Sequence, residues 1–261
     1  MSIQPVESYP PLLSLAVHEF RTPAGVVGGY LRMLQRDADL NERQRKMIDE
    51  AEKSCARLVA IVAELSDIGK LDSGAIALAR QPLDFFALTR EVAELVHEGR
   101  EREVQLVVRG EEARATIVGD AARLRHAVDA IFRTILREKP GPTTVVADQR
   151  LEIRDGRSSA VLVVAEELSV AEAYDAPPGV FDDRRGGLGL ALPLARRVIT
   201  GLGGDIWSPA APESLSRGSI VVRIPALWIG TVRASAADLT PGRALARRST
   251  SSKKASRRGR S

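Results

Sequence analysis

Three residues close together near the N-terminus have side chains that could take part in group transfer. His18 is one of only three histidines in the 261-residue chain; Glu19 follows it directly, and Thr22 comes four residues after it. Histidine is neutral for much of the range near pH 7, and a neutral imidazole nitrogen is a competent nucleophile. In a helix, Thr22 would lie on the same face as His18. The alternative is an ordinary surface histidine.

A second group of residues has the composition of a phosphate-binding loop. Gly186, Gly187 and Gly189 lie in the sequence RRGGLGLAL at 184–192, just before a stretch with helical periodicity. Glycines let a ligand approach the backbone closely, and the start of a helix offers free N–H groups to anions. The alternative here is a glycine-rich turn that binds nothing.

His18 belongs to a helix that we expect over residues 8–38. Because His18 follows the apolar position Val17, its ring should point away from the apolar seam and toward solvent. Pro23 removes one backbone hydrogen bond and should bend the helix. The apolar residues step alternately by four and three, which is a heptad seam: Leu13, Val17, Phe20, Ala24, Val27, Leu31 and Leu34.

A second helix is expected over residues 41–71, with the same heptad spacing. Asn41 and Gln44 form a plausible capping box at its start, and Gly74 follows its end. Two such helices joined by a short link predict an antiparallel hairpin. One hairpin alone would leave half of each seam in water, so we expect a homodimer through residues 8–74 that forms a four-helix bundle.

The pattern changes after Gly74, where short strand-like stretches alternate with helical ones. This alternation predicts a sheet packed against helices. The expected fold class is therefore α+β, with a helical hairpin followed by an α/β sandwich. The expected domains are an N-terminal extension at 1–7, the hairpin at 8–74, the sandwich at 75–230, and a basic disordered tail at 231–261.

Over residues 8–227 the chain resembles the sensor histidine kinases of two-component signalling. The order and spacing of five segments carry this resemblance: HEFRTP at 18–23, LSDIGKLDSGAIALARQPLDFFALTREV, GDAARLRHAVDAIFRTILREKPG, GGLGLALPLARRVITGLGGDIW and SRGSIVVRIP. They are similar, in that order, to the family's phospho-acceptor box, its interdomain junction, its metal-ligand helix, its phosphate box and its last strand.

The resemblance implies a role for each residue of the N-terminal group. His18 takes the place of the family's phospho-acceptor histidine. Glu19 takes the place of the acid that accepts the imidazole proton or fixes the tautomer. Thr22 takes the place of the residue that helps position a water for dephosphorylation of the partner regulator. The implied partner is the receiver domain of a response regulator.

The resemblance also implies ATP and Mg²⁺ as cofactors, but the residues at the metal position depart from the family. The family's two asparagines fall on Ala130 and Thr134. Alanine cannot ligate Mg²⁺, whereas threonine can do so weakly through its hydroxyl, which makes Thr134 the candidate metal ligand. Arg137 takes the place of the basic residue that usually follows.

The adenine position departs from the family as well. The aspartate that holds the adenine amino group falls on Glu166, which keeps an acceptor but moves it outward by one methylene. The two glycines that follow it in the family fall on Leu168 and Val170. These larger side chains are expected to crowd the nucleotide pocket. The lid is short, and Phe181 is a candidate remnant of its phenylalanine motif.

Two functions from different classes follow. The first is an ATP-dependent histidine kinase that phosphorylates His18 and passes the phosphoryl group to a response-regulator aspartate. The alternative is a histidine phosphotransfer or phosphatase protein whose kinase domain is degenerate and does not use ATP. The intact acceptor box argues against a third possibility, a purely structural dimer scaffold.

The composition supports a globular protein. Apolar residues make up 44% and charged residues 28% of the chain, and no apolar run approaches the roughly 18 residues of a membrane span. With no signal peptide and a single cysteine, we expect a cytoplasmic protein. The net charge of +4 arises from residues 241–261, which carry eight Lys/Arg and no acid. This tail is either a solubilising end or weakly attracted to acidic surfaces or nucleic acid.

Overall fold

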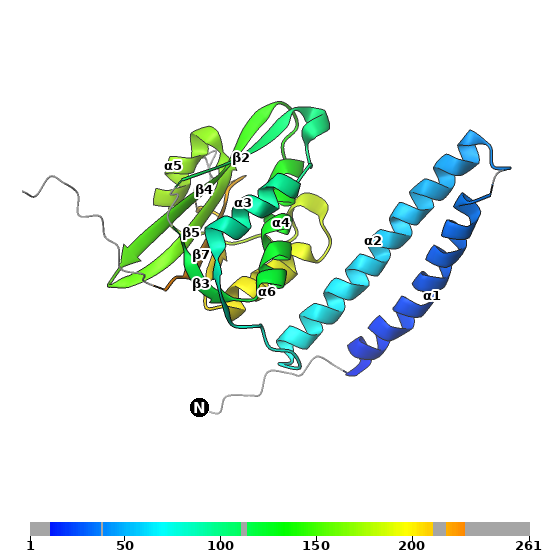
Figure 1. Cartoon of the computed structure of the whole chain (residues 1–261), viewed down its shortest axis with the longest axis horizontal. Coiled ribbons are helices and arrows are strands. Elements are labelled where there is room, and N and C mark those ends of the chain that lie inside the picture. The colour runs from blue at the N-terminus through cyan, green and yellow to red at the C-terminus, as the bar shows by residue number, and fades with distance from the viewer. Residues whose placement is uncertain (1–10, 38, 111–113, 211–217, 228–261) are drawn as a thin grey trace, which may run out of the picture. The chain divides into compact units, whose positions relative to one another are not determined.

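The computed structural model of the chain describes residues 11–37, 39–110, 114–210 and 218–227 (Figure 1). Two long helices come first: α1 (Pro11–Gln35) and α2 (Glu42–Asp72), which pack against each other as a hairpin. The expected capping box is present, because the Asn41 side chain accepts the backbone N–H of Gln44 while the Gln44 side chain accepts that of Asn41. Both expected helices are therefore confirmed, and residues 8–10 of the first lie outside the described ones.

A small two-stranded sheet opens the second part. β1 (Gln81–Asp84) pairs antiparallel with β3 (Thr116–Gly119). The last residue of β1, Asp84, also caps α3 (Phe85–Leu95), because its carboxylate accepts the backbone N–H groups of Phe86 and Ala87. One side chain thus ends a strand and starts a helix.

The main sheet has five strands in the order β2, β4, β5, β7 and β6 (Figure 1). β2 and β4 are parallel and every other neighbouring pair is antiparallel. Their bounds are β2 Val104–Gly110, β4 Thr143–Arg154, β5 Arg157–Glu166, β6 Asp205–Trp207 and β7 Ile220–Pro225.

The turn between β4 and β5 lies at Asp155 and Gly156, within the sequence DGRS. Both residues have positive φ, 52° and 74°. Two consecutive positive φ angles are the geometry of the tight hairpin turns for which Asp-Gly is favoured. The register follows directly, with Arg154 opposite Arg157 next to the turn.

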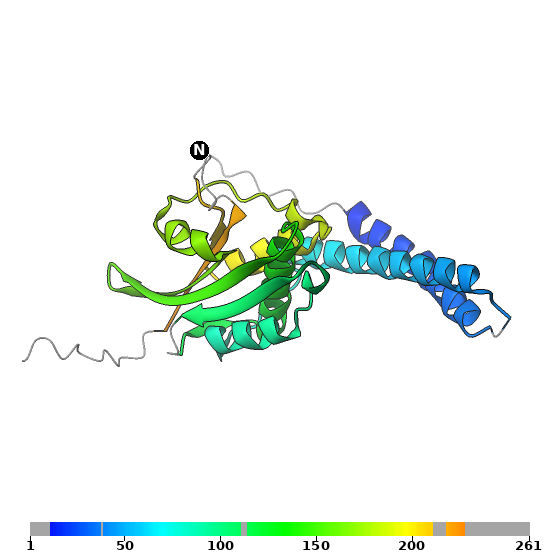
Figure 2. The ribbon, with the colours of Figure 1, turned by 90° about the horizontal axis from the view of Figure 1, so that it is seen from above.

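Helices cover both faces of the main sheet (Figure 2). Successive strand residues point to opposite faces, so alternate side chains of β4 and β5 enter two separate cores. The larger core lies between the sheet and the helices α3, α4 (Ala121–Arg137) and α6 (Ala191–Gly201). The smaller core lies beneath α5 (Val170–Asp175) and contains Val146, Val161, Val163, Ala165, Val170, Ala173, Trp207 and Val221.

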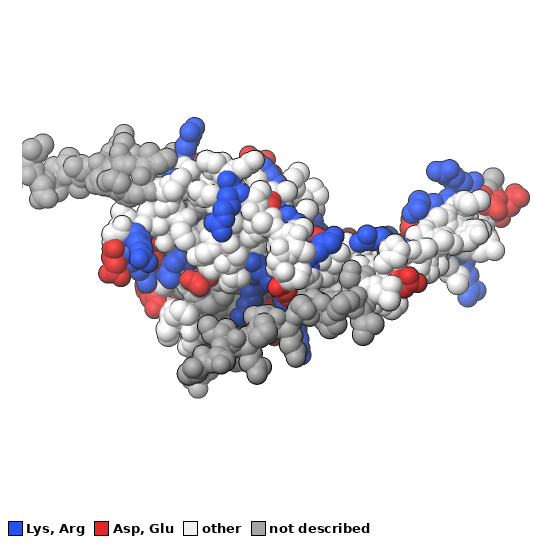
Figure 3. Space-filling model, turned by 90° about the horizontal axis from the view of Figure 1, so that it is seen from below, with Lys and Arg blue, Asp and Glu red and all other residues white. Residues whose placement is uncertain are grey.

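The expected α+β architecture is confirmed, and α5 is the addition that the sequence did not predict. Three short 3-10 segments complete the described chain: Arg100–Arg102, Glu167–Ser169 and Arg185–Gly187. The expected extension at 1–7 and basic tail at 231–261 lie outside the described residues. Within the part that is described, no helix is long and apolar enough to cross a membrane. The face in Figure 3 carries basic and acidic side chains interspersed.

Candidate functional site

The group around His18 lies on the outer face of α1. His18, Glu19 and Thr22 are all exposed, whereas Val17 and Ala24 are 7% and 8% exposed. The Cys55 thiol of α2 donates to the Ala24 carbonyl at 3.2 Å, so Ala24 lies on the side of α1 that faces α2. His18 is therefore on the helix surface, as its place next to the seam predicts.

Only part of the seam is buried within one hairpin. Phe20, Val27 and Leu34, each seven residues after the last, are 61%, 51% and 47% exposed. The side chain of Leu13, the first residue of the expected seam, lies outside the described ones. The exposed residues form a stripe along α1 that the single chain leaves in water.

The glycine-rich loop lies against α4. Gly186, Gly187 and Gly189 all have positive φ, at 66°, 60° and 69°. Gly186 packs on Thr134: a Cβ at Gly186 would lie 2.8 Å from the Thr134 Cα. The structure thus brings together two predicted site residues that are 52 positions apart, and the approach requires glycine.

One face of α2 contacts the same loop. The Arg57 guanidinium donates to the Gly187 carbonyl at 2.8 Å, and the Glu64 carboxylate accepts the backbone N–H of Leu190 at 3.1 Å. Ile61 lies between them, within 3.2 Å of where a Gly189 Cβ would be. Burial raises the pKa of the Glu64 carboxyl, and the hydrogen bond from Leu190 partly offsets this effect.

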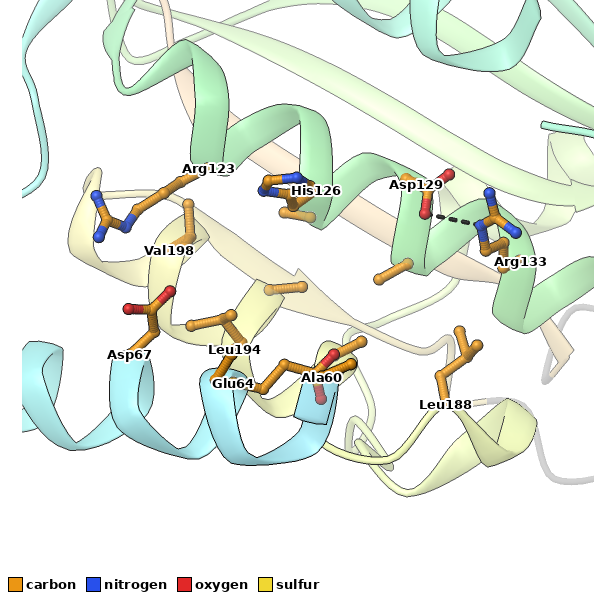
Figure 4. Close-up of a pocket in the computed structure, with 15 residues that line it drawn as sticks. Ala60, Glu64, Asp67, Arg123, His126, Asp129, Arg133, Leu188, Leu194 and Val198 are labelled. Carbon is orange, nitrogen blue, oxygen red and sulfur yellow. Dashed lines mark hydrogen bonds and ion pairs between the residues drawn. The ribbon is translucent and has the colours of Figure 1, made fainter. Parts of the chain in front are cut away.

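A cavity of about 410 Å³ lies beside this contact, between α2, α4 and α6 (Figure 4). Its walls are largely small and apolar, and Asp67 of α2 points toward Arg123 of α4 across it, while Glu64 is held by the backbone N–H of Leu190. Asp129 and Arg133 pair with each other at 2.8 Å on its rim. The apolar lining consists of Ala60, Ala63, Ala127, Ala130, Leu188, Ala191, Leu194, Ala195 and Val198.

The residues predicted for the metal and the phosphates have other partners in this arrangement. Thr134 is fully buried, and its hydroxyl donates to the Ala130 carbonyl at 2.7 Å. Arg137 forms an ion pair with Glu98 at 3.1 Å. Among the described residues, no group of three or more His, Cys, Asp or Glu side chains is placed to hold a metal ion. In the described part of the chain, the Thr134 hydroxyl is therefore engaged with Ala130 and is not presented to a metal ion.

The predicted adenine acceptor, Glu166, is paired with a cation. Lys139, just after α4, lies 2.7 Å from the Glu166 carboxylate, and its side chain is only 12% exposed. Arg185 is buried to the same extent and holds Glu138, Ser208 and the carbonyls of Gly218 and Ser219. Sequence reasoning missed both cations, because nothing in the local pattern links Lys139 or Arg185 to the strand ends they contact.

The two residues that were expected to crowd the nucleotide pocket, Leu168 and Val170, lie in different surroundings. The Leu168 side chain is 90% exposed. Val170 is buried under α5 in the smaller core, and neither residue lines the cavity. The chain turns onto the other face of the sheet directly after Glu166, and this redirects both side chains. Phe181, the candidate lid remnant, lies in the larger core.

Comparison with known proteins gives these sites a context. A sequence model of the His Kinase A (phospho-acceptor) domain matches residues 12–74, which include His18. The chain is 25% identical over 223 residues to the sensor protein GacS of Pseudomonas syringae pv. syringae, covering 80% of this chain and 24% of GacS. It is 26% identical over 215 residues to the signal transduction histidine-protein kinase BarA of Escherichia coli K12, covering 77% and 23%.

Among solved structures, the chain is similar to full-length ShkA in complex with AMPPNP. The TM-score is 0.63 at 24% sequence identity, over 83% of this chain and 46% of ShkA. This likeness concerns the fold. The chain spans about a quarter of the length of the curated relatives it matches.

Proposed function

Because the chain is similar to sensor histidine kinases of two-component signalling over most of its length, we propose that it is an ATP-dependent protein histidine kinase. His18 accepts the phosphoryl group, and the receiver domain of a response regulator takes it over on an aspartate. The observation that carries the proposal is the exposed group His18, Glu19 and Thr22 on α1, within the segment that matches the phospho-acceptor domain.

The proposed reaction proceeds in two transfers. The His18 nitrogen forms a bond to the γ-phosphorus while the bond between that phosphorus and the ADP oxygen breaks. The imidazole proton passes to Glu19, the adjacent base. The receiver carboxylate then attacks the phosphorus, the P–N bond breaks, and the histidine takes up a proton again. Thr22, one turn from His18, is proposed to position a water for dephosphorylation of the regulator.

The proposal assigns the nucleotide to the second domain. The backbone at Gly186, Gly187 and Gly189, just before α6, supplies N–H groups suited to phosphate oxygens. Arg137 remains the proposed basic residue of the nucleotide site, and Glu166 remains the proposed acceptor for the adenine amino group. We assign no step to a protein-bound metal, because the described residues offer no set of ligands for one. The similarity of the fold to that of ShkA supports the proposal that this domain binds ATP.

The setting of the reaction forms part of the same proposal. We propose a homodimer through residues 8–74, supported by the exposed apolar stripe at Phe20, Val27 and Leu34. We also propose a cytoplasmic location, where ATP and response regulators are found, and a basic tail that contacts acidic surfaces. Thr134 remains the proposed metal contact if its hydroxyl is released from Ala130.

A specific observation favours the alternative, a phosphotransfer or phosphatase protein that does not use ATP. Glu166 is held by Lys139, and the Thr134 hydroxyl is buried and engaged. Both positions would have to rearrange before they could serve a nucleotide. The relative BarA is named a histidine-protein kinase, so the kinase remains our first proposal.

Labelling with Mg-ATP carrying a labelled γ-phosphate tests the proposal. We expect acid-labile label on the full chain, lost in His18→Ala and retained in His97→Ala, a control at another exposed histidine. If the chain takes no label from Mg-ATP but His18 accepts phosphate from a phosphorylated receiver domain, the alternative holds. Label that persists in His18→Ala would contradict both functions.

A further inference from the structure

The residue directly before α6, Leu190, is hydrogen-bonded by a side chain of α2. The N-cap residue of α6, Leu190, makes no capping hydrogen bond with its own side chain. Glu64, 126 residues earlier in the chain, accepts the backbone N–H of Leu190 at 3.1 Å instead. A carboxylate on a backbone N–H at a helix start makes the same kind of contact as a phosphate oxygen. Glu64 therefore takes part of the anion-binding capacity of the glycine-rich loop.

Two further contacts hold this arrangement on the same face of α2. Arg57, Ile61 and Glu64 are spaced by four and three residues, so their side chains lie in one row along the helix. Arg57 binds the Gly187 carbonyl, and Ile61 lies against Gly189. Near the C-terminal end of α2, Asp72 pairs with Arg197 of α6 at 2.7 Å. The row of three contacts covers the loop from Gly187 to Leu190.

We propose that Glu64 is an internal occupant of the loop's anion site, whose carboxylate competes with the phosphates of a nucleotide and must leave when they bind. This inference rests on the proposed function insofar as the competing anion is a nucleotide. The contact makes the docked hairpin an autoinhibitory state: α2 is fastened to the loop that the nucleotide would use. Release of α2 and loading of nucleotide are then coupled through a single site.

The contact is built to be reversible. The Glu64 carboxyl is partly buried, and burial raises its pKa, so the ionised carboxylate stays docked at a cost in hydration. The cavity next to Glu64 gives its side chain room to move, since Leu188 and Ala130 line that space. A ligand with several negative charges would gain more from the loop N–H groups than a single carboxylate does.

The test uses the full chain and two measurements. Hydrogen exchange of the Leu190 amide, without nucleotide, reports the contact itself; titration with Mg-ADP reports competition. For Glu64→Ala we expect faster Leu190 exchange and a Kd for Mg-ADP about tenfold lower, because the competitor is gone. Glu64→Gln should give smaller changes of both kinds, since its amide oxygen can still accept the N–H. Glu50→Ala, on an exposed part of α2, should change neither.

Unchanged Leu190 exchange in Glu64→Ala would overturn the inference, and so would faster exchange with an unchanged Kd. His18 labelling from Mg-ATP separates this result from a failure of the proposed function. If Glu64→Ala and the unmodified chain both label on His18 with equal Mg-ADP affinity, only the inference fails. If neither labels, the proposed kinase function fails, while the exchange of the Leu190 amide still decides whether Glu64 holds the loop.

Discussion

At the scale of single residues, the glycine-rich loop shows how two adjacent glycines can differ. Gly186 and Gly187 both have positive φ, which costs an L-residue about 1–2 kcal/mol. A Cβ at Gly186 would also lie 2.8 Å from the Thr134 backbone, whereas nothing lies within 4 Å of one at Gly187. A side chain at Gly187 would therefore meet backbone strain alone, whereas one at Gly186 would meet both backbone strain and a steric conflict.

Alanine substitutions at the two glycines test this distinction. We expect Gly187→Ala to lower the free energy of unfolding by about 1 kcal/mol, from backbone strain alone. Gly186→Ala should lower it by about 3 kcal/mol, because α4 and the loop must also move apart. Chemical denaturation of both variants beside the unmodified chain measures the difference. Equal losses would show that the loop does not pack on Thr134.

The sequence predicted single residues well where one chemical property decides the outcome. His18 follows a buried seam residue, so its exposure depends only on helix geometry. The ion pair of Glu166 was harder to predict, because its partner Lys139 is 27 positions earlier in the chain and reaches it only after the sheet has formed. Glu64 was missed for the same reason, since its acceptor role depends on α2 lying against α6. Local patterns carry no information on such long-range polar contacts.

At the scale of elements, the helix caps were the easiest feature to predict from the sequence. The helix that covers the second face of the main sheet was the hardest. The caps at Asn41 and Asp84 follow from residue type and position, and both are present. The helix α5 has only six residues, too few for a clear periodic signal. It forms because the outer face of β4, β5 and β7 is apolar and needs a cover, which is a tertiary cause.

The cap of α4 at Asp120 carries a consequence for pH. Its carboxylate accepts the backbone N–H groups of Arg123 and Ala79 and pairs with the Arg123 guanidinium at 3.2 Å. Burial alone would raise the pKa of Asp120, but these contacts outweigh it and the pKa lies below the ordinary value. Asp120 therefore stabilises the fold fully above the unfolded pKa of about 4, and this contribution is lost as the pH falls through the lower folded pKa.

Substitution of Asp120 tests the direction of this pH dependence of stability. At pH 7 we expect Asp120→Ala to lower the free energy of unfolding by about 1 kcal/mol, a typical loss for an N-cap. The difference from the unmodified chain should shrink as the pH falls below about 4. Urea denaturation at pH 7, 5 and 3 measures it. Asp120→Asn, which keeps a cap acceptor, should lose less free energy of unfolding at pH 7. If the difference between Asp120→Ala and the unmodified chain grows at pH 3, the stabilising role of the ionised Asp120 carboxylate is contradicted.

At the scale of the whole molecule, the exposed stripe on α1 supports the proposed homodimer. Phe20, Val27 and Leu34 recur every seven residues and stay about half exposed or more in one chain. A heptad repeat of this kind is satisfied when two hairpins pack into a four-helix bundle. In a two-fold dimer the same stripe would serve both chains. His18, one step from buried Val17, need not be covered by this packing.

A charge placed in the stripe should separate the two copies. Burial of a phenylalanine side chain contributes about 1.5–3 kcal/mol, and a symmetric dimer contains the substitution twice. We therefore expect Phe20→Glu to weaken the dimer by on the order of 100-fold or more. Sedimentation velocity across micromolar concentrations measures the shift from dimer to monomer. Leu95→Glu on α3, where the leucine is 71% exposed but lies outside the hairpin, is the control and should leave the dimer unchanged. If Phe20→Glu sediments as the unmodified chain does at every concentration, this stripe is not the interface, and the apolar face of α1 must serve some other contact.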